Sequence, residues 1–486
     1  MRLPRVRIRV MTFPSENFLT RFSYPGILTL ILFLNATLLQ TMTGQATSQV
    51  PAKSAPSTEA GELQNLLDQH RYIEFSDKLV ATDPTHLTAP QTLYFSGMLA
   101  FSLGQLDNAA PRLIRAVNTD KEHSLTRAQD SKALEILGQI NLKLTFYSGA
   151  AKIEGLLYQT MGTNPGPGGQ AILDRRHLAE LLAKVPPQTV DLTEDFTLSA
   201  ANNSSQVTSA EYAVSIPGQP APAKPLLTRF DTGAEISLLS ASTAKAWGVT
   251  MLEGSATLLG AGGGTFQAQP GFLPALTIGK AQFHNVAVYV AADENLYFAP
   301  LKTQLNATLG YSVLHALGRL TFREDGSLHV EAKSPERDPH STTLWLANHF
   351  LLIELATRPV FKDKTLVDVA DDRLFVLDTG SASTLLTDRY FTEHKELFAG
   401  QSSGQATLGG SDGAHAVNAY GVQNLPLFAN KSGLFLLNGQ HVLAQPIVGP
   451  AEDYFGIIGQ DALRELAGYT IDFRRMTFTI LEKEAY

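Results

Sequence analysis

Residues 376–384 read VLDTGSAST, and residues 229–237 read RFDTGAEIS. Both segments contain the tripeptide Asp-Thr-Gly, which each time ends a largely apolar stretch and precedes small residues. At average composition, a given tripeptide of this kind is expected roughly 0.1 times in a chain this long. A second copy in matching surroundings therefore indicates an internal duplication.

Further features recur in the same order after each tripeptide. A glycine-rich stretch begins 29 residues after Asp231 and 31 residues after Asp378. A short element that ends in glycine, Thr-Leu-Gly at 308–310 and Ile-Ile-Gly at 457–459, ends 79 and 81 residues after the respective aspartates. A helix-like segment and a final strand follow each of these elements. Several features in one order at nearly equal spacing predict that the two halves descend from one unit.

The sequence pattern changes at Pro186-Pro187. From residue 59 to about 190, apolar residues recur at three- and four-residue spacing, which predicts helices. Beyond this point, short apolar or alternating runs are punctuated by Gly, Pro and Asn, which is typical of an all-β region. We therefore predict a multidomain fold, with an all-α domain at 59–190 and an all-β part whose two lobes span 200–335 and 341–486.

Small residues recur in the helical region at Gly97, Gly104, Ala109 and Ala116. Small residues let paired helices approach closely, and this pattern resembles a tetratricopeptide helical hairpin. An ordinary helical bundle is the alternative. Stacked helix pairs offer a concave surface for peptides, so we expect this domain to recruit a protein substrate or partner.

The paired aspartates suggest a particular chemistry. Hydrolysis of an amide without a metal or a covalent nucleophile needs a base to activate water and an acid to protonate the carbonyl oxygen. Two carboxylates within about 3 Å cannot both ionise, so one keeps a proton while the other does not. If Asp231 and Asp378 meet, the pair supplies both functions.

These motifs together resemble the aspartic peptidase superfamily, over about residues 205–486. The short lobes and Ala234 after the first tripeptide are more similar to the retropepsin-like branch than to pepsin. The resemblance implies a fused pseudo-dimer that acts as an aspartic endopeptidase, with a peptide or protein substrate in the cleft between the lobes. Such a peptide would bind largely through its backbone, as an added strand.

The resemblance also implies roles for individual residues. The threonines of the two tripeptides would hydrogen-bond across the lobe boundary, and the glycines would permit the tight turns that bring the loops together. The glycine-rich stretches would form mobile flaps over the substrate. The candidate residues are Asp231 and Asp378 as the catalytic pair; Thr232, Gly233, Thr379 and Gly380 as loop support; and Gly260, Gly262, Gly263, Gly264, Gly409 and Gly410 in the flaps.

One feature departs from the expected pattern. Phe375, Val376 and Leu377 fit a buried strand that leads to Asp378, whereas Thr228 and Arg229 are expected to interrupt the strand before Asp231.

Two other functions stay open: a catalytically silent peptide-binding module, and a membrane-tethered scaffold that acts through its helical repeats.

Composition excludes several kinds of site. The formal net charge is −8, and no basic stripe lies outside the extreme N-terminus, which argues against binding of nucleic acid. The chain has no cysteine, so disulfides and thiolate zinc sites are excluded. The twelve histidines form no HExxH or comparable ligand pair, and we predict neither a metal nor another cofactor.

The N-terminus has the pattern of a secretory signal peptide, predicted at 1–46. Five arginines precede the apolar run at 27–34, and the small-residue sequence Gly-Gln-Ala follows at 44–46. A linker rich in Ser, Thr, Pro and Ala is predicted at 47–58. We expect an exported protein, periplasmic or extracellular. An uncleaved membrane anchor is the alternative, although the apolar run is shorter than the about 20 residues that span a bilayer.

Overall fold

The computed structural model shows two compact units, and among the described residues the division falls after Lys184. The predicted signal peptide, the linker and Gly260, Gly262, Gly263 and Gly264 lie outside the described residues. Among the residues that the structure describes, no helix has both the length and the apolar character needed to cross a membrane. The structure describes residues 59–120, 124–161, 166–200, 211–218, 226–259, 265–298, 303–347, 350–362, 365–410, 413–429, 433–443 and 453–482.

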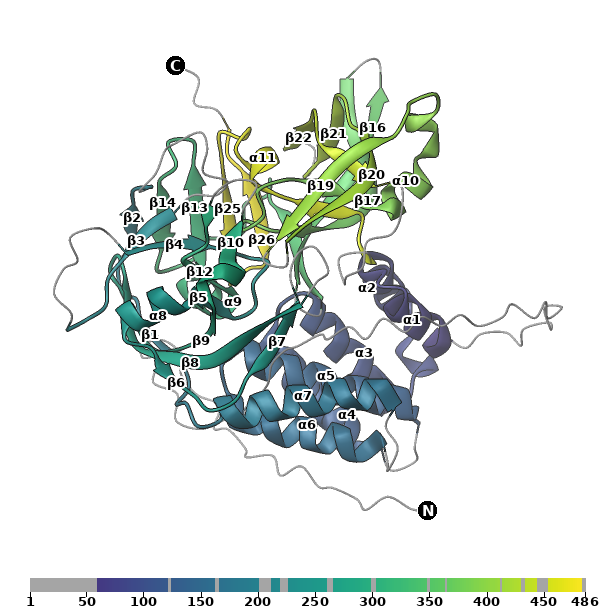
Figure 1. Ribbon diagram of the computed structural model, residues 1–486. Helices are drawn as coiled ribbons and strands as arrows, with labels where there is room; N and C mark the ends of the chain where they lie inside the picture. The colour runs from purple at the N-terminus through teal and green to yellow at the C-terminus, as the bar shows by residue number, and fades with distance from the viewer. Residues whose placement is uncertain are drawn as a thin grey trace. The chain divides into compact units, whose positions relative to one another are not determined.

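The first unit is helical, as the sequence predicts. Its helices are α1 (Glu59–Asp68), α2 (Tyr72–Ala81), α3 (Ala89–Ser102), α4 (Leu106–Thr119), α5 (Arg127–Lys143), α6 (Tyr147–Met161) and α7 (Gly166–Leu182), with a short 3₁₀ turn at Pro84–His86. Consecutive helices pack as hairpins, most extensively α3 with α4, α6 with α7 and α5 with α6 (Figure 1).

Local sequence explains where these helices begin and why they pack closely. The hydroxyl of Thr88 accepts a hydrogen bond from the backbone N–H of Gln91, and the Gln91 side chain accepts one from the Thr88 N–H, which caps α3. On the same helix, a Cβ added to Gly97 would lie 2.8 Å from the side chain of Leu113 on α4. The small residue therefore sets the close approach of this hairpin. The likeness to tetratricopeptide repeats stays a prediction.

The second unit is rich in β-strands and holds two similar lobes. The first contains β1 (Thr189–Asp191), β3 (Glu211–Val214), β4 (Leu226–Phe230), β5 (Ser237–Ser240), β6 (Thr250–Met251), β7 (Ala256–Leu259), β8 (Thr265–Ile278), β9 (Ala281–Ala291), β10 (Tyr297–Phe298), β11 (Thr303–Gln304) and β12 (Ala307–Leu309), with helices α8 (Ala241–Trp247) and α9 (Tyr311–Leu317). The second contains β16 (Phe350–Lys362), β17 (Thr365–Leu377), β18 (Leu385–Leu386), β19 (Gly404–Gly410), β20 (Gly413–Gly421), β21 (Leu425–Phe428), β22 (Leu434–Leu437), β23 (His441–Leu443) and β24 (Gly456–Ile458), with helices α10 (Asp388–Glu393) and α11 (Gln460–Leu463).

Strand topology shows how the duplication is built. In the first lobe, β12 lies between β4 and β5, parallel to β4 and antiparallel to β5. In the second, β24 lies between β17 and β18, again parallel to the first and antiparallel to the second. In each lobe, therefore, a strand from late in the lobe inserts beside the strand that leads to the Asp-Thr-Gly loop.

A sheet shared by both lobes joins them (Figure 1). Its central part has the order β2 (Phe196–Leu198), β14 (Leu328–Glu331), β13 (Arg319–Arg323), β25 (Gly468–Asp472), β26 (Thr477–Ile480) and β15 (Thr342–Ala347), and from β15 the sheet continues into β16 of the second lobe. Three strands come from each half, and β13 pairs with β25 at the centre, where Thr321 lies opposite Thr470. The arrangement has approximate two-fold symmetry about this pair.

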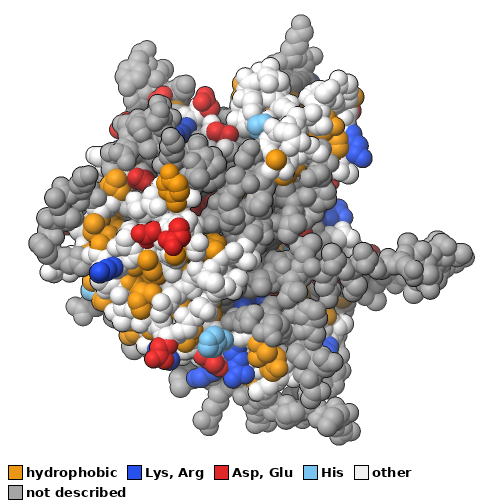
Figure 2. Space-filling model, viewed as in Figure 1, with side chains coloured by type: hydrophobic (Ala, Val, Ile, Leu, Met, Phe, Trp, Pro, Cys, Tyr) orange, Lys and Arg blue, Asp and Glu red, His pale blue; other side chains and the backbone are white. Residues whose placement is uncertain are grey.

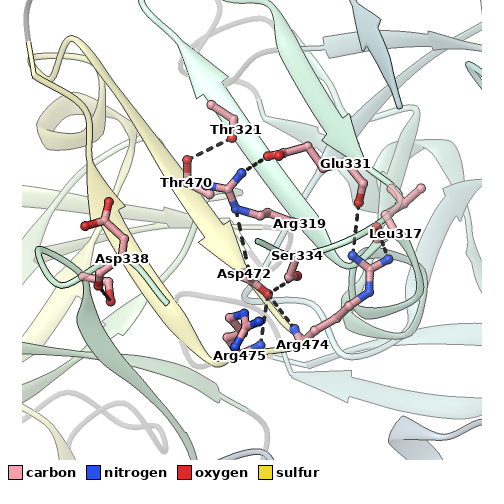
Figure 3. A network of polar contacts seen from close by, with 11 residues as sticks. Leu317, Arg319, Thr321, Glu331, Ser334, Asp338, Thr470, Asp472, Arg474 and Arg475 are labelled. Atoms are coloured by element: carbon pink, nitrogen blue, oxygen red, sulfur yellow. Dashed lines mark hydrogen bonds and ion pairs between the residues drawn. The ribbon is translucent and has the colours of Figure 1, made fainter. Parts of the chain in front are cut away.

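Polar side chains connect the two halves across this sheet (Figure 3). The hydroxyls of Thr321 and Thr470 are buried and lie 2.9 Å apart. Arg319 forms an ion pair with Glu331 on the neighbouring strand β14, and its Nε lies 3.8 Å from Asp472 Oδ2 on β25. Because Asp472 is almost fully buried, these contacts hold the lobes in one fixed register.

The predicted interruption before Asp231 is wrong. Strand β4 runs from Leu226 to Phe230 without a break, and both Thr228 and Arg229 are buried within it. Threonine is a good strand former, and a long arginine stem can be buried along a sheet. The strand therefore tolerates both residues.

Candidate active site

Both predicted aspartates lie at the ends of equivalent strands. Asp231 follows β4 directly, and its backbone N–H donates to the carbonyl oxygen of Leu309 on β12 at 3.0 Å. Asp378 follows β17, and its N–H donates to the carbonyl oxygen of Ile458 on β24 at 3.1 Å. The inserted parallel strand of each lobe thus fixes the backbone of the aspartate.

The turn after each aspartate binds one oxygen of its carboxyl group. Asp231 Oδ1 accepts the N–H groups of Gly233 at 2.8 Å and Ala234 at 3.2 Å. Asp378 Oδ1 accepts the N–H groups of Gly380 and Ser381, both at 2.9 Å. The two carboxyl groups are therefore oriented in the same way by their own loops.

Thr232 and Thr379 join the loops across the lobe boundary. The Thr232 hydroxyl donates to the carbonyl oxygen of Leu377 at 2.6 Å, and the Thr379 hydroxyl donates to that of Phe230 at 2.8 Å. Each hydroxyl also accepts the backbone N–H of the other threonine, at 3.1 and 3.0 Å. Both threonines are 1% exposed, so each bond forms away from water and resists loop separation.

The two carboxyl groups face each other over the loop glycines. A Cβ added to Gly233 would lie 2.7 Å from the carboxyl carbon of Asp378, and a Cβ added to Gly380 would overlap the carboxyl group of Asp231. Each carboxyl group also affects the pKa of the other, as expected for two acids in such close proximity. Glycine is therefore required at both positions because any side chain would fill the space that the opposite carboxyl group occupies.

The electrostatics of this pair are those of two acids that share a proton. Both side chains are partly buried. Burial raises the pKa of Asp378 well above its ordinary range, and the negative charge of Asp231 raises it further. Burial also raises the pKa of Asp231, while the hydrogen bond from Asp378, the Gly233 N–H and the charge of Arg229 act in the opposite direction. One proton can thus stay on the pair while the second is lost.

A second pair of hydroxyls supports the loops, and the sequence analysis missed it. Ser237 Oγ accepts the backbone N–H of Gly310 at 3.2 Å, and Thr384 Oγ1 accepts that of Gly459 at 2.9 Å. Both hydroxyl residues lie six positions after their aspartate. An alignment of the two halves on the aspartates would have revealed this repeated hydroxyl.

Of the predicted flap residues, the structure describes those of the second lobe. Gly409 and Gly410 end β19, in a hairpin where Gly410 pairs with Gly413 of β20. In the first lobe, β7 and β8 pair up to Leu259 and Thr265, on either side of the residues that the structure does not describe. The described part of the chain contains no group of three or more His, Asp or Glu side chains that could hold a metal ion.

Comparison with known proteins gives a match that covers part of the first lobe. The profile of the aspartyl protease family matches residues 214–313. This segment includes Asp231 and its loop and ends within α9. No curated protein matches the chain significantly. The chain therefore carries an aspartyl-protease-like region in its first lobe, and the strand order of the second lobe repeats that region's arrangement.

Proposed function

We propose that the β-rich unit is an aspartic endopeptidase with one active site, built from Asp231 and Asp378. The observation that carries the proposal is the meeting of two Asp-Thr-Gly loops, each with its carboxyl group against the glycine of the other. Isolated Asp-Gly turns are common in proteins. Here, two buried threonines join two such turns symmetrically, which a simple hairpin does not need. This arrangement supports a catalytic pair.

In the proposed reaction, a water molecule lies between the two carboxyl groups and the peptide carbonyl. The ionised carboxylate takes a proton from the water, whose oxygen forms a bond to the carbonyl carbon. The protonated carboxyl group gives its proton to the carbonyl oxygen, which yields a tetrahedral diol. The first carboxyl group then protonates the amide nitrogen, the second takes a proton back from a diol hydroxyl, and the C–N bond breaks. The pair returns to its starting state.

We propose a peptide or unfolded protein segment as the substrate, bound in extended form between the lobes. The hairpin of β19 and β20 ends in glycines at 409, 410 and 413. Because glycine has no side chain, the backbone of a bound peptide could pack closely against this end of the hairpin. A substrate bound as a strand gains affinity from its backbone and specificity from alternate side chains. In this account the signal-like N-terminus directs the enzyme out of the cytoplasm.

A cleavage assay with matched variants tests the function. The parent chain, Asp231→Asn, Asp378→Asn and the control Asp388→Asn on α10 are incubated with a peptide library between pH 3 and 8. We expect cleavage by the parent and the control, and loss of cleavage in both active-site variants, because an amide cannot take part in the shared-proton arrangement. Peptide binding without cleavage by the parent would instead support the silent binding module.

A further inference from the structure

The pseudo-symmetry of the two loops is broken by one charged residue. Arg229 lies two positions before Asp231, and Val376 lies two positions before Asp378. Side chains two apart along an extended chain point to the same side. Each aspartate directly follows its strand and its backbone N–H still bonds to the neighbouring strand, so the residue two positions earlier lies on the same side as the aspartate. Arg229 is 9% exposed and Val376 is 1% exposed. A buried cation therefore accompanies Asp231, whereas an aliphatic side chain accompanies Asp378.

The charge of Arg229 is only partly compensated by its neighbours. Its cross-strand partner on β3 is Glu211, and Arg229 Nη2 lies 4.0 Å from Glu211 Oε1. Arg229 Nε is buried and has no hydrogen-bond partner among the residues that the structure describes. On the other side, β12 places Thr308 in register with Arg229 and contributes no charge there. One long ion pair is a weak counterbalance for a buried guanidinium group.

The other charges near this guanidinium group point to the active site. Burial lowers the pKa of Arg229, while Asp231, Glu211 and Asp378 raise it and Arg464, after α11, lowers it. Arginine nevertheless keeps its proton in proteins, so the group stays cationic. Burial raises the pKa of Asp231, and the positive charge of Arg229 opposes that rise. The main influences on Asp378 are burial and the charge of Asp231, both of which raise its pKa.

We propose that Arg229 is a positioning residue that assigns the shared proton, keeping Asp231 as the carboxylate and leaving the proton on Asp378. This inference rests on the proposed function and adds to it a separate role for each aspartate. Asp231 becomes the base that takes the proton from water, and Asp378 becomes the acid that protonates the carbonyl oxygen. If both halves had the same residue two positions before the aspartate, nothing at that position would decide which aspartate is the base and which is the acid.

The pH profile of cleavage provides the first test. Arg229→Leu removes the charge, Arg229→Lys keeps it, and the double variant Glu211→Gln/Arg229→Leu removes both ends of the ion pair so that no carboxylate is stranded. An opposite charge within about 4–6 Å lowers a carboxyl pKa by about 1–3 units. We therefore expect the acidic limb of kcat/KM to move up by about one pH unit or more in both leucine variants, with kcat affected more than KM. Arg229→Lys should keep most of the parent profile.

A second test needs no activity. The melting temperature of each chain is compared with that of the same chain carrying Asp231→Asn, between pH 3 and 8. The pH at which the difference changes reports the loss of the first proton from the pair, which the inference assigns to Asp231. We expect this midpoint to lie higher in Arg229→Leu than in the parent. This comparison is also sound if the leucine variant is less stable, because each chain is its own reference.

The two readouts separate failure of the inference from failure of the proposed function. Cleavage by the parent with an unmoved acidic limb and an unmoved midpoint would overturn the role of Arg229 and leave the peptidase intact. Absence of cleavage with a moved midpoint would support Arg229 as the group that ionises Asp231 and would refute the peptidase. Absence of cleavage with an unmoved midpoint would overturn both.

Discussion

Thr232 and Thr379 exchange hydrogen bonds, because the backbone N–H of each donates to the hydroxyl of the other at 3.1 and 3.0 Å. The two residues are 147 positions apart in the chain. The fold around this pair, including the shared central sheet, holds the carboxyl groups of Asp231 and Asp378 in one place.

Removal of the Thr232 hydroxyl should loosen this junction. In Thr232→Ala, the carbonyl oxygen of Leu377 and the N–H of Thr379 would stay buried without their present partner, at a cost of about 1–3 kcal/mol. Urea unfolding of the full chain measures the loss. Thr232→Ser keeps the hydroxyl and should lose much less. Equal stability of the alanine and serine variants would show that these bonds do not hold the lobes.

A methyl group on Gly380 should disable the site with little effect on the rest of the fold. In Gly380→Ala, the new Cβ would collide with the carboxyl group of Asp231, and displacement of a reacting group by about 1 Å can cost on the order of 100-fold in rate. The control is Gly404→Ala on β19, where a Cβ would meet no described atom within 4 Å. Full cleavage activity in Gly380→Ala would contradict the close approach of the carboxyl groups.

The active-site pair should reduce stability at neutral pH. The folded-state pKa of Asp378 lies well above 3.8, its ordinary value, because of burial and the charge of Asp231. A raised pKa gives stability that is fully present below the unfolded pKa and is lost as the pH rises through the folded pKa. Asp378→Asn cannot ionise, so its melting temperature should exceed that of the parent near pH 7, by on the order of a few degrees. The difference should shrink toward pH 3, and a difference independent of pH would be inconsistent with this explanation.

The central sheet should show coupling between Thr321 and Thr470. Each single Thr→Val change leaves one buried hydroxyl without the 2.9 Å partner that it now has, at a cost of about 1–3 kcal/mol. The double variant removes both hydroxyls and should be nearly as stable as the parent. Chemical unfolding of the four chains gives the coupling energy. If the losses of the two single variants instead add up in the double variant, the two hydroxyls do not interact across the β13–β25 pair.

The sequence was a good guide to the fold wherever local chemistry demanded particular residues. At Gly233 and Gly380, a side chain would occupy the space of the opposite carboxyl group, so the structure needs glycine there. The repeated Asp-Thr-Gly motif therefore identified both loops from the sequence. Strand β2, at Phe196–Leu198, was missed because three residues are too few to show an alternating pattern. Its place in the central sheet depends on pairing with β14, more than 120 residues later.

Arg229 shows the limit of the sequence argument at the site itself. A charged residue in a strand pattern suggests exposure or a break, and the sequence offers no sign of Glu211 on the neighbouring strand. Only the folded sheet reveals that the guanidinium group is buried beside the active-site pair. By contrast, Ser237 and Thr384 could have been found from sequence, since both occupy the sixth position after their aspartate.

The central claim is that Asp231 and Asp378 act as one unit, and a double-mutant cycle of peptide cleavage tests it most directly. The kcat of the parent, Asp231→Asn, Asp378→Asn and the double variant is measured at the optimal pH of the parent. Residues that share one function are strongly non-additive, so we expect each single variant to lose as much activity as the double variant. Substantial activity in either single variant, with a further loss in the double variant, would show that the two aspartates act separately and would contradict the account.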